Sequence, residues 1–302
     1  MALLQRFGYL FQDPAPDFAF ELTEAGIAYA KPALGVPPAF QPLEEGTLVI
    51  SPLSNNVHRP ELITEHVRAV IGPATGRRRR SAVLILPDFC SRVAVLGFDS
   101  FPSDAAEQLS LVRFRMKKSV PFEVESAVVG YFPLPARSSS NKGVDVVIVA
   151  ASLDIVSHYE APFRLAGLHP GFVTTAALAT LELLRSPGIT VLARLTGKIL
   201  TVSVVSAGNL KLVRCVELTS PSHDEVLGVL FPTIAYVEDE MGAKPDRLAL
   251  CGFGDAAEDG SWQVELDAPV ERLQSRFGAP SRFNAGLLGY LESLTPAGAK
   301  VA

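Results

Sequence analysis

The sequence predicts an α/β protein made of two similar halves, with a small α+β subdomain inserted in the first half. The chain has 302 residues, of which 48% are hydrophobic and 20% charged, so it has enough apolar side chains for a large core. A β-hairpin followed by further strand and helix patterns occurs near the start and recurs after residue 189. A separate block of strand and helix patterns lies between them. Two similar halves facing each other are expected to leave a cleft between them.

The first half opens with a predicted hairpin over residues 17–30, turning at Glu24-Ala25-Gly26 and ended by the prolines at 32, 37 and 38. A strand is expected at 47–51. Residues 60–71 are predicted to be a helix, because Pro60 suits a first-turn position and Gly72-Pro73 stops the pattern.

The middle block has its own alternation of strands and helices. Ser103 is the expected cap of its first helix, and glycine at 167 is expected just past the end of its second. The pattern predicts strands at 81–86, 91–97, 124–133 and 144–151, and helices at 103–119 and 152–166. Apolar contacts of the first helix are expected from Leu109, Val112, Phe114 and Met116.

The second half repeats the hairpin-rich opening. A helix at 175–184 returns to the first half, and strands at 189–195, 199–205 and 211–218 follow. A long helix at 222–241 precedes a strand at 247–251 and a glycine turn. The predicted division is therefore 1–80 and 173–188 for the first half, 81–172 for the inserted subdomain and 189–302 for the second half.

The charge and the cysteines exclude several classes of protein. A net charge of −5 argues against a nucleic-acid partner. Cys90, Cys215 and Cys251 lie far apart in apolar runs and are expected to be reduced thiols, and the five histidines show no metal-ligand spacing. No stretch has the length of a signal peptide or a membrane span, so the chain is expected in the cytoplasm.

One basic run stands out, the four arginines at 77–80. A solvated linker is the first interpretation of such a run, and a contact with anionic lipid headgroups is the second.

Several segments in the middle of the chain resemble the type IV pilus assembly protein PilM family, within the actin-like ATPase superfamily. They occur in the family's order and spacing, and the resemblance spans roughly residues 18–255. It implies an actin-like (ribonuclease H-like) fold with duplicated halves, and assembly contacts at the extra subdomain. The segments are the strand and proline at 81–88, Lys118-Ser119-Val120-Pro121-Phe122, the apolar run 146–151 with Tyr159 downstream, and Leu165-Ala166-Gly167-Leu168-His169-Pro170.

The resemblance also implies a nucleotide cleft, whose key positions are replaced here. In the superfamily two hairpins grip the phosphates through an Asp-x-Gly pattern, in which glycine lets backbone N–H groups approach phosphate. The first hairpin has Glu21 and Thr23 at these positions, and the second has Arg194 and Thr196, with Gly197 leaving a shift of one residue open. A guanidinium has only donors and cannot coordinate a cation, so Arg194 is expected to meet a phosphate, to pair with Glu21 or to be a solvated strand residue. Gly252 and Gly254 resemble the loop that faces adenosine.

These departures predict a scaffold rather than a catalyst, with no catalytic residue and no bound metal. The resemblance implies a PilN-like inner-membrane partner, whose cytosolic tail would bind as an extended peptide. That would place the chain at the inner face of the inner membrane. Self-association is a further expectation, and the face formed by the first hairpin and the extra subdomain is the expected peptide site. Two alternatives remain open: a switch that binds ATP and Mg, and a kinase-like enzyme of the same superfamily.

Overall fold

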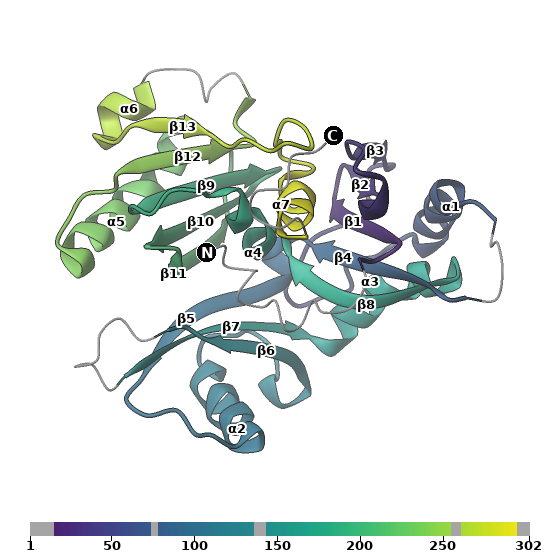
Figure 1. Ribbon diagram of the computed structural model, residues 1–302, viewed down its shortest axis with the longest axis horizontal. Helices are drawn as coiled ribbons and strands as arrows, with labels where there is room; N and C mark the ends of the chain where they lie inside the picture. The colour runs from purple at the N-terminus through teal and green to yellow at the C-terminus, as the bar shows by residue number, and fades with distance from the viewer. Residues whose placement is uncertain (1–14, 74–77, 136–142, 255–260, 295–302) are drawn as a thin grey trace.

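The computed structural model describes residues 15–73, 78–135, 143–254 and 261–294, and their strands form three sheets (Figure 1). Two of these sheets have five strands each and the third has three. Each five-stranded sheet begins with an antiparallel hairpin, and a third antiparallel strand pairs with the second strand of that hairpin. Two later strands run parallel to the first strand of the hairpin. The repetition of one topology confirms the predicted duplication of an α/β unit.

The first sheet has the order β3-β2-β1-β4-β8. Its outward face packs against α1 (Pro60–Ile71) and α3 (Leu153–Leu165), and its other face packs against α4 (Ala176–Thr180) and α7 (Ala285–Ser293). Helix α1 has the predicted bounds, with Gly72 at its C-cap. The strands are β1 (Phe18–Thr23), β2 (Gly26–Ala30), β3 (Ala39–Pro42), β4 (Arg80–Leu86) and β8 (Leu168–Thr175).

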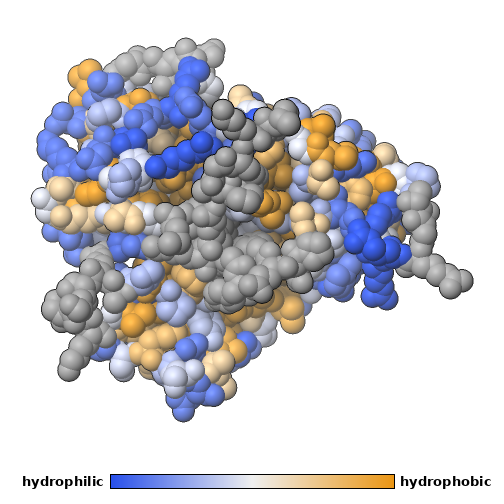
Figure 2. All heavy atoms as spheres, viewed as in Figure 1, coloured by the Kyte–Doolittle hydropathy of each residue, from blue (hydrophilic) through white to orange (hydrophobic). Residues whose placement is uncertain are grey.

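The second sheet has the order β11-β10-β9-β12-β13, and α5 (His223–Met241) and α6 (Ser261–Leu266) cover its outer face. Ser222 caps α5 by accepting a hydrogen bond from the Glu225 N–H. In the space-filling view, hydrophilic side chains predominate over this half (Figure 2). Its strands are β9 (Thr190–Thr196), β10 (Ile199–Ser206), β11 (Asn209–Glu217), β12 (Arg247–Cys251) and β13 (Val270–Arg272).

The third sheet belongs to the inserted subdomain and has the order β5-β7-β6. These strands are β5 (Ser91–Phe98), β6 (Ala127–Pro133) and β7 (Val144–Ser152). Alternation along β7 gives the sheet two apolar faces: Val146 and Ile148 pack toward α2 (Ala105–Met116), whereas Val147 and Val149 face a core shared with both halves. The subdomain therefore rests on both halves at once.

The predicted boundaries of the insert need correction, because sheet pairing assigns two of its segments to the first half. Strand β4 pairs with β1, and β8 pairs with β4, so both lie in the first sheet. Helix α3 lies in the core of that half as well. The separate sheet begins only at Ser91 and ends at Ser152.

Three local predictions were also wrong. Residues 47–51 form only an isolated bridge between Leu48 and Val57, and the third strand of the first sheet is β3, after the prolines. The cap of α2 is Asp104, whose carboxylate accepts from two backbone N–H groups, and not the neighbouring Ser103. Phe114, an expected apolar contact, is 75% exposed on that helix.

Two arginines of the run 77–80 have partners within the chain. Arg78 pairs with Asp17, and Arg80 donates to the backbone oxygen of Ile71 at 2.8 Å. Arg77 lies outside the described residues.

Helix α7 follows the second sheet in sequence but packs on the first half, which corrects the predicted assignment of the whole stretch 189–302 to the second half. It crosses α4 at two glycines. A Cβ at Gly289 would lie 2.0 Å from the backbone oxygen of Ala179, and one at Gly286 would lie 3.0 Å from Cα of Ala176. Only glycine permits this approach at Gly289, and the crossing holds the C-terminal helix α7 on the first half.

Within the described ranges, no helix is long and apolar enough to cross a membrane. No group of three metal-ligating side chains is found among the same residues. The three cysteines are free thiols.

Candidate functional site

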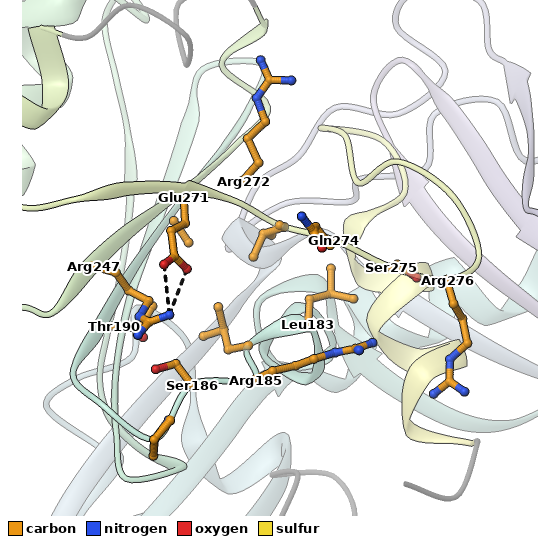
Figure 3. A pocket seen from close by; sticks show the side chains of 14 residues that line it. Leu183, Arg185, Ser186, Thr190, Arg247, Glu271, Arg272, Gln274, Ser275 and Arg276 are labelled. Carbon is orange, nitrogen blue, oxygen red and sulfur yellow. Dashed lines mark hydrogen bonds and ion pairs between the residues drawn. The ribbon is translucent and has the colours of Figure 1, made fainter. Parts of the chain in front are cut away.

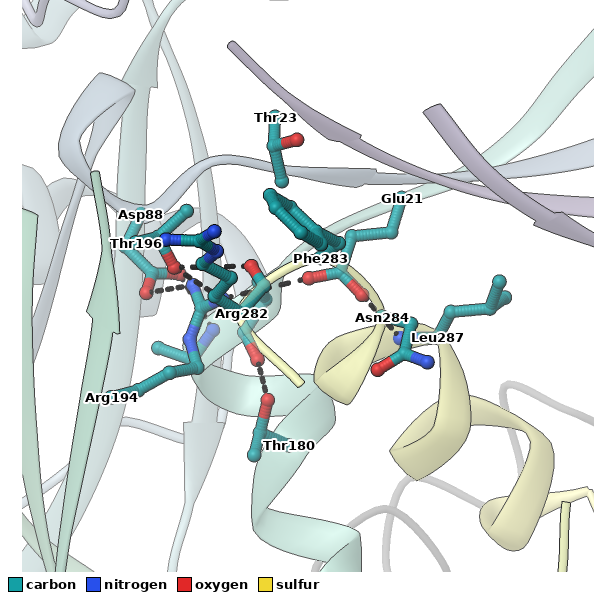
Figure 4. A network of polar contacts seen from close by, with 12 residues as sticks. Glu21, Thr23, Asp88, Thr180, Arg194, Thr196, Arg282, Phe283, Asn284 and Leu287 are labelled. Atoms are coloured by element: carbon teal, nitrogen blue, oxygen red, sulfur yellow. Dashed lines mark hydrogen bonds and ion pairs between the residues drawn. The ribbon is translucent and has the colours of Figure 1, made fainter. Parts of the chain in front are cut away.

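A cavity of about 490 Å³ lies between the turn of the first hairpin and the β9–β10 turn of the second half. Its walls carry Glu21 and Thr23 from β1, and Arg194 and Thr196 from β9 (Figure 4). The structure thus brings together four of the six residues predicted for the nucleotide cleft.

Arg194 is the centre of a buried ion network in this cleft. Its Nη2 donates to Oδ2 of Asp88 at 2.5 Å, and its Nη1 lies 3.6 Å from Oε1 of Glu21 and donates to Oγ1 of Thr196 at 3.1 Å. Burial disfavours the charged guanidinium, but the Asp88 and Glu21 carboxylates more than offset this and raise the pKa of Arg194 above its ordinary value. Arg194 is therefore a fixed cation at this point.

Asp88 connects three parts of the chain. It lies in the short 3-10 helix η3 (Asp88–Cys90), directly after Pro87 at the end of β4. Its Oδ1 accepts from the backbone N–H of Ala177 at 2.6 Å, and its Oδ2 accepts from the Thr201 hydroxyl at 2.8 Å as well as from Arg194. The carboxylate therefore ties α4 of the first half to β9 and β10 of the second.

Glu21 is fully buried, and its two oxygens differ. Its Oε2 accepts from the backbone N–H of Leu287 on α7 at 2.8 Å, whereas Oε1 has only the longer contact with Arg194 and no hydrogen bond. Burial raises the pKa of Glu21 to about 7, although Arg194 opposes the shift, and the Asp88 carboxylate adds to it.

This raised pKa predicts a dependence of stability on pH. Below its unfolded-state pKa of 4.5, Glu21 is protonated in both states, and between 4.5 and about 7 only the folded state keeps the proton. Its contribution to the free energy of unfolding is therefore full at low pH and is lost as the pH rises through about 7. We expect Glu21→Gln to gain stability relative to wild type, by on the order of 1–3 kcal/mol, between pH 5 and pH 8. Urea unfolding at both pH values measures this, and parallel profiles for the two proteins would contradict it.

The two threonines at the predicted glycine positions serve the hairpin and the ion network. Thr23 is buried, and its hydroxyl donates to the backbone oxygen of Gly26 at 3.0 Å, which closes the turn. Thr196 donates to the backbone oxygen of Arg282 at 3.4 Å. At neither position is the backbone free of a side chain, as glycine would leave it for the approach of a phosphate.

Gly252 and Gly254 do not share the cavity of Glu21 and Arg194. They line a neighbouring cavity of about 790 Å³, and Arg282 and Phe283 line both cavities. Gly252 has φ +87°, and a Cβ there would lie 2.0 Å from the backbone oxygen of Leu195, so packing against β9 already requires a glycine.

The side chains of the cleft differ from those expected around Mg²⁺ and a nucleoside triphosphate, because an arginine stands where the second acid is expected. Three of the four carboxylate oxygens of Glu21 and Asp88 accept from Arg194, Thr201 and two backbone N–H groups, and Oε1 of Glu21 accepts no hydrogen bond. The cavity is also rich in acid, with Glu24 and Glu45 at its wall, and Glu24 is held by the backbone N–H of Ile50. Acidic side chains repel phosphate, and a guanidinium cannot hold a metal ion.

Sequence reasoning missed Asp88, which contributes the second acid of the network. A polar residue directly after a buried strand and a proline was the available signal, since strand ends in α/β sheets commonly carry site residues. The pairing with Arg194 could not be foreseen, because the two residues are separated by 106 positions.

A second candidate site is an apolar groove of about 290 Å³ between the inserted sheet and the first half. Strand β6 lines one side and β8 the other, and each is the outer strand of its sheet within the described residues. Val128 and Gly130 share the face of β6 that is turned to the groove, because Val129 and Tyr131 pack on the α2 side. A Cβ at Gly130 would meet no atom within 4 Å.

Comparisons with known proteins match this structure but not the sequence. No protein-family model matches the chain, and the curated proteins contain no significant match to it. A chain of the PilM-PilN type IV pilus biogenesis complex superposes with a TM-score of 0.69 at 15% identity, covering 94% of this chain and 100% of the other. A protein with actin-like ATPase fold and unknown function from Bacteroides thetaiotaomicron superposes with a TM-score of 0.51 at 13% identity, covering 90% and 94%. The predicted fold class is confirmed: the chain has the actin-like ATPase fold.

Proposed function

We propose that this protein is an actin-like scaffold of a type IV pilus or type II secretion-like assembly. It binds the cytosolic tail of a PilN-like inner-membrane protein as an extended peptide, and it does not hydrolyse ATP. The observation that carries this proposal is the apolar groove between the outer strands β6 and β8.

The groove suits an extended peptide for two reasons. An outer strand offers backbone N–H and C=O groups to a peptide, and pockets beside it take alternate side chains. The lining is largely aliphatic and aromatic, with Val128, Phe132 and Phe172 among its residues, and Val128 is 44% exposed. Apolar side chains of a bound segment would be buried there.

The proposed groove overlaps only in part with the face that the sequence led us to expect for the peptide. It involves the inserted subdomain as expected, but its lining includes no residue of the β1–β2 hairpin. Its other wall comes from β8, α3 and α4.

The likeness to a chain of the PilM-PilN complex supports the class of partner. At 15% identity this likeness establishes the fold alone, and the partner and the assembly are part of what we propose. The protein would then lie at the inner face of the inner membrane through its partner.

The ion pairs that bridge the cleft support a scaffold whose two halves do not open and close. Arg194 of the second half pairs with Asp88 and Glu21 of the first half. In an ATP-dependent switch of this fold, the phosphates would be expected between these two hairpins. The inserted sheet adds a further link, because Lys211 of β11 lies 3.6 Å from Asp145 of β7 beside a shared apolar core. Opening the cleft would leave buried charges unpaired, which is costly.

A groove-filling variant tests the proposed binding site. Gly130→Trp places a large side chain in open space at the groove, so we expect it to fold and to lose at least about tenfold in affinity for the partner tail. Fluorescence polarisation would use synthetic N-terminal tails of membrane proteins encoded beside this gene. Gly228→Trp is the matched control, since Gly228 is exposed on α5 with nothing within 4 Å of its Cβ position. Binding of no tail by wild type, or equal binding by Gly130→Trp, would contradict the proposal.

The absence of nucleotide turnover is tested separately. Calorimetry of the wild type with Mg-ATP should show no binding heat at millimolar nucleotide, because Arg194 and the acidic wall occupy the phosphate position. Tight binding that is abolished by Glu21→Ala would instead establish the ATP-dependent switch.

A further inference from the structure

One end of the first sheet collects basic side chains that neither candidate site uses. The parallel strands β1, β4 and β8 begin there, and β2 ends there, because Ala30 pairs with Ala19 near the start of β1. Helices α1 and α3 end there too: Arg68 of α1 donates to the backbone oxygen of Leu165, the last residue of α3, at 3.0 Å. Strongly hydrophilic side chains gather at this end of the first half (Figure 2). We call it the basic end, and its cations are Lys31, Arg68, Arg78, Arg79 and Arg80.

Several cations of the basic end are held by groups that carry no full negative charge. Arg80 donates to two backbone oxygens at the C-terminus of α1, at 2.8 and 3.2 Å, and the Lys31 ammonium lies 5.4 Å from the centre of the Phe18 ring. Such oxygens and aromatic faces position a cation but have only partial charge. By contrast, Arg247 on the wall of the largest cavity described, of about 1200 Å³, contacts both carboxylate oxygens of Glu271 (Figure 3).

The basic end therefore keeps an excess of positive charge. Arg79 is exposed, and within the described ranges it makes no hydrogen bond or ion pair. Asp17 pairs with Arg78. The last two turns of α1 and α3 add the acids Glu65 and Glu160, of which Glu160 is paired within α3. Five cations against Asp17 and Glu65 leave three positive charges in excess, in a chain whose net charge is −5.

Two exposed leucines flank these cations. The backbone N–H of Leu34 donates to the backbone oxygen of Lys31 at 2.9 Å, and Leu34 is 63% exposed. Leu165, beside Arg68, is 65% exposed. Binding to the surface of a membrane grows with the apolar area that enters the interface and with the attraction of cations to anionic lipid. The basic end offers both.

We propose that the basic end binds directly to a bilayer that contains anionic phospholipids. The excess cations attract the headgroups, with Arg79 as the cation that has no partner in the protein, and Leu34 and Leu165 enter the interfacial layer. A few cations and two leucines give a weak, reversible contact rather than an anchor. This contact goes beyond the proposed function, because it needs no partner tail.

A nucleic acid is the other polyanion that a basic surface can bind, and two observations favour the bilayer. Phe18, the ring that Lys31 and Arg80 approach, is only 5% exposed and offers no face on which a base could stack. The net charge of −5 also opposes a long polyanion that runs past the rest of the protein, whereas a bilayer meets one end of it.

Co-sedimentation of the full chain with vesicles at low ionic strength tests this contact. Wild type should bind vesicles of phosphatidylcholine with phosphatidylglycerol, and not vesicles of phosphatidylcholine alone. Arg79→Gln should bind about fivefold more weakly, and Leu165→Ser should also lose affinity. Lys118→Gln and Val264→Ser are the matched controls, since each replaces an exposed side chain of the same kind outside the basic end, and both should bind as wild type does.

Equal binding to both kinds of vesicle, binding to neither, or equal losses in Arg79→Gln and Lys118→Gln would overturn the proposal. Binding of an RNA duplex that depends on Arg79, without binding to vesicles, would assign the basic end to nucleic acid instead. Gly130→Trp, which fills the groove proposed for the partner tail, should sediment with anionic vesicles as wild type does. Failure of tail binding and failure of lipid binding are thereby told apart.

Discussion

Arg194→Met is expected to lower the free energy of unfolding by about 3–5 kcal/mol, because it leaves Asp88 and Glu21 buried without their shared cation. Both carboxylates are at most 5% exposed, so they would have little contact with water in place of the guanidinium. Urea unfolding followed by circular dichroism at pH 7.5 measures the loss.

Two further variants make this prediction specific. Arg282→Met removes an exposed arginine that lines the same cavity and stacks on Phe283, and it should cost less than about 1 kcal/mol. Neutralising both acids in the Arg194→Met background, with Glu21→Gln and Asp88→Asn, should recover part of the lost stability. A loss below about 1 kcal/mol in Arg194→Met would show that the network does not hold the halves together.

Gly289→Ala is expected to destabilise the protein by about 3 kcal/mol, although the change adds a single methyl group. That methyl would lie 2.0 Å from the backbone oxygen of Ala179, and backbone on α4 cannot yield as a flexible side chain would. Helix α7 would have to shift, which also weakens the hydrogen bond from the Leu287 N–H to Glu21.

The same substitution at Gly228 is the control. Gly228 lies inside α5 with nothing within 4 Å of its Cβ position, so Gly228→Ala should stabilise the protein by about 0.5–1 kcal/mol through helix propensity. Thermal unfolding of both variants reports the difference, and a Gly289→Ala protein as stable as wild type would contradict the close crossing of α4 and α7.

The sequence by itself determined the local elements and the duplicated α/β plan. Helix α1 was predicted with its correct bounds, because Pro60 and Gly72 mark its ends. The two hairpins and the strands that follow were predictable because apolar alternation and glycine turns are features of neighbouring residues. The placement of Glu21 and Arg194 facing each other followed from the family resemblance rather than from the pattern.

Only the tertiary structure decided how the cleft is closed and where ligands can bind. Asp88 and Arg194 meet although 106 positions separate them, and the N–H of Leu287 reaches Glu21 from 266 positions away. The groove beside β6 likewise combines segments from distant parts of the chain. Hydrophobic periodicity records which face of an element is buried, but it carries no information on which distant element covers that face. Contacts between the halves therefore had to come from the folded structure.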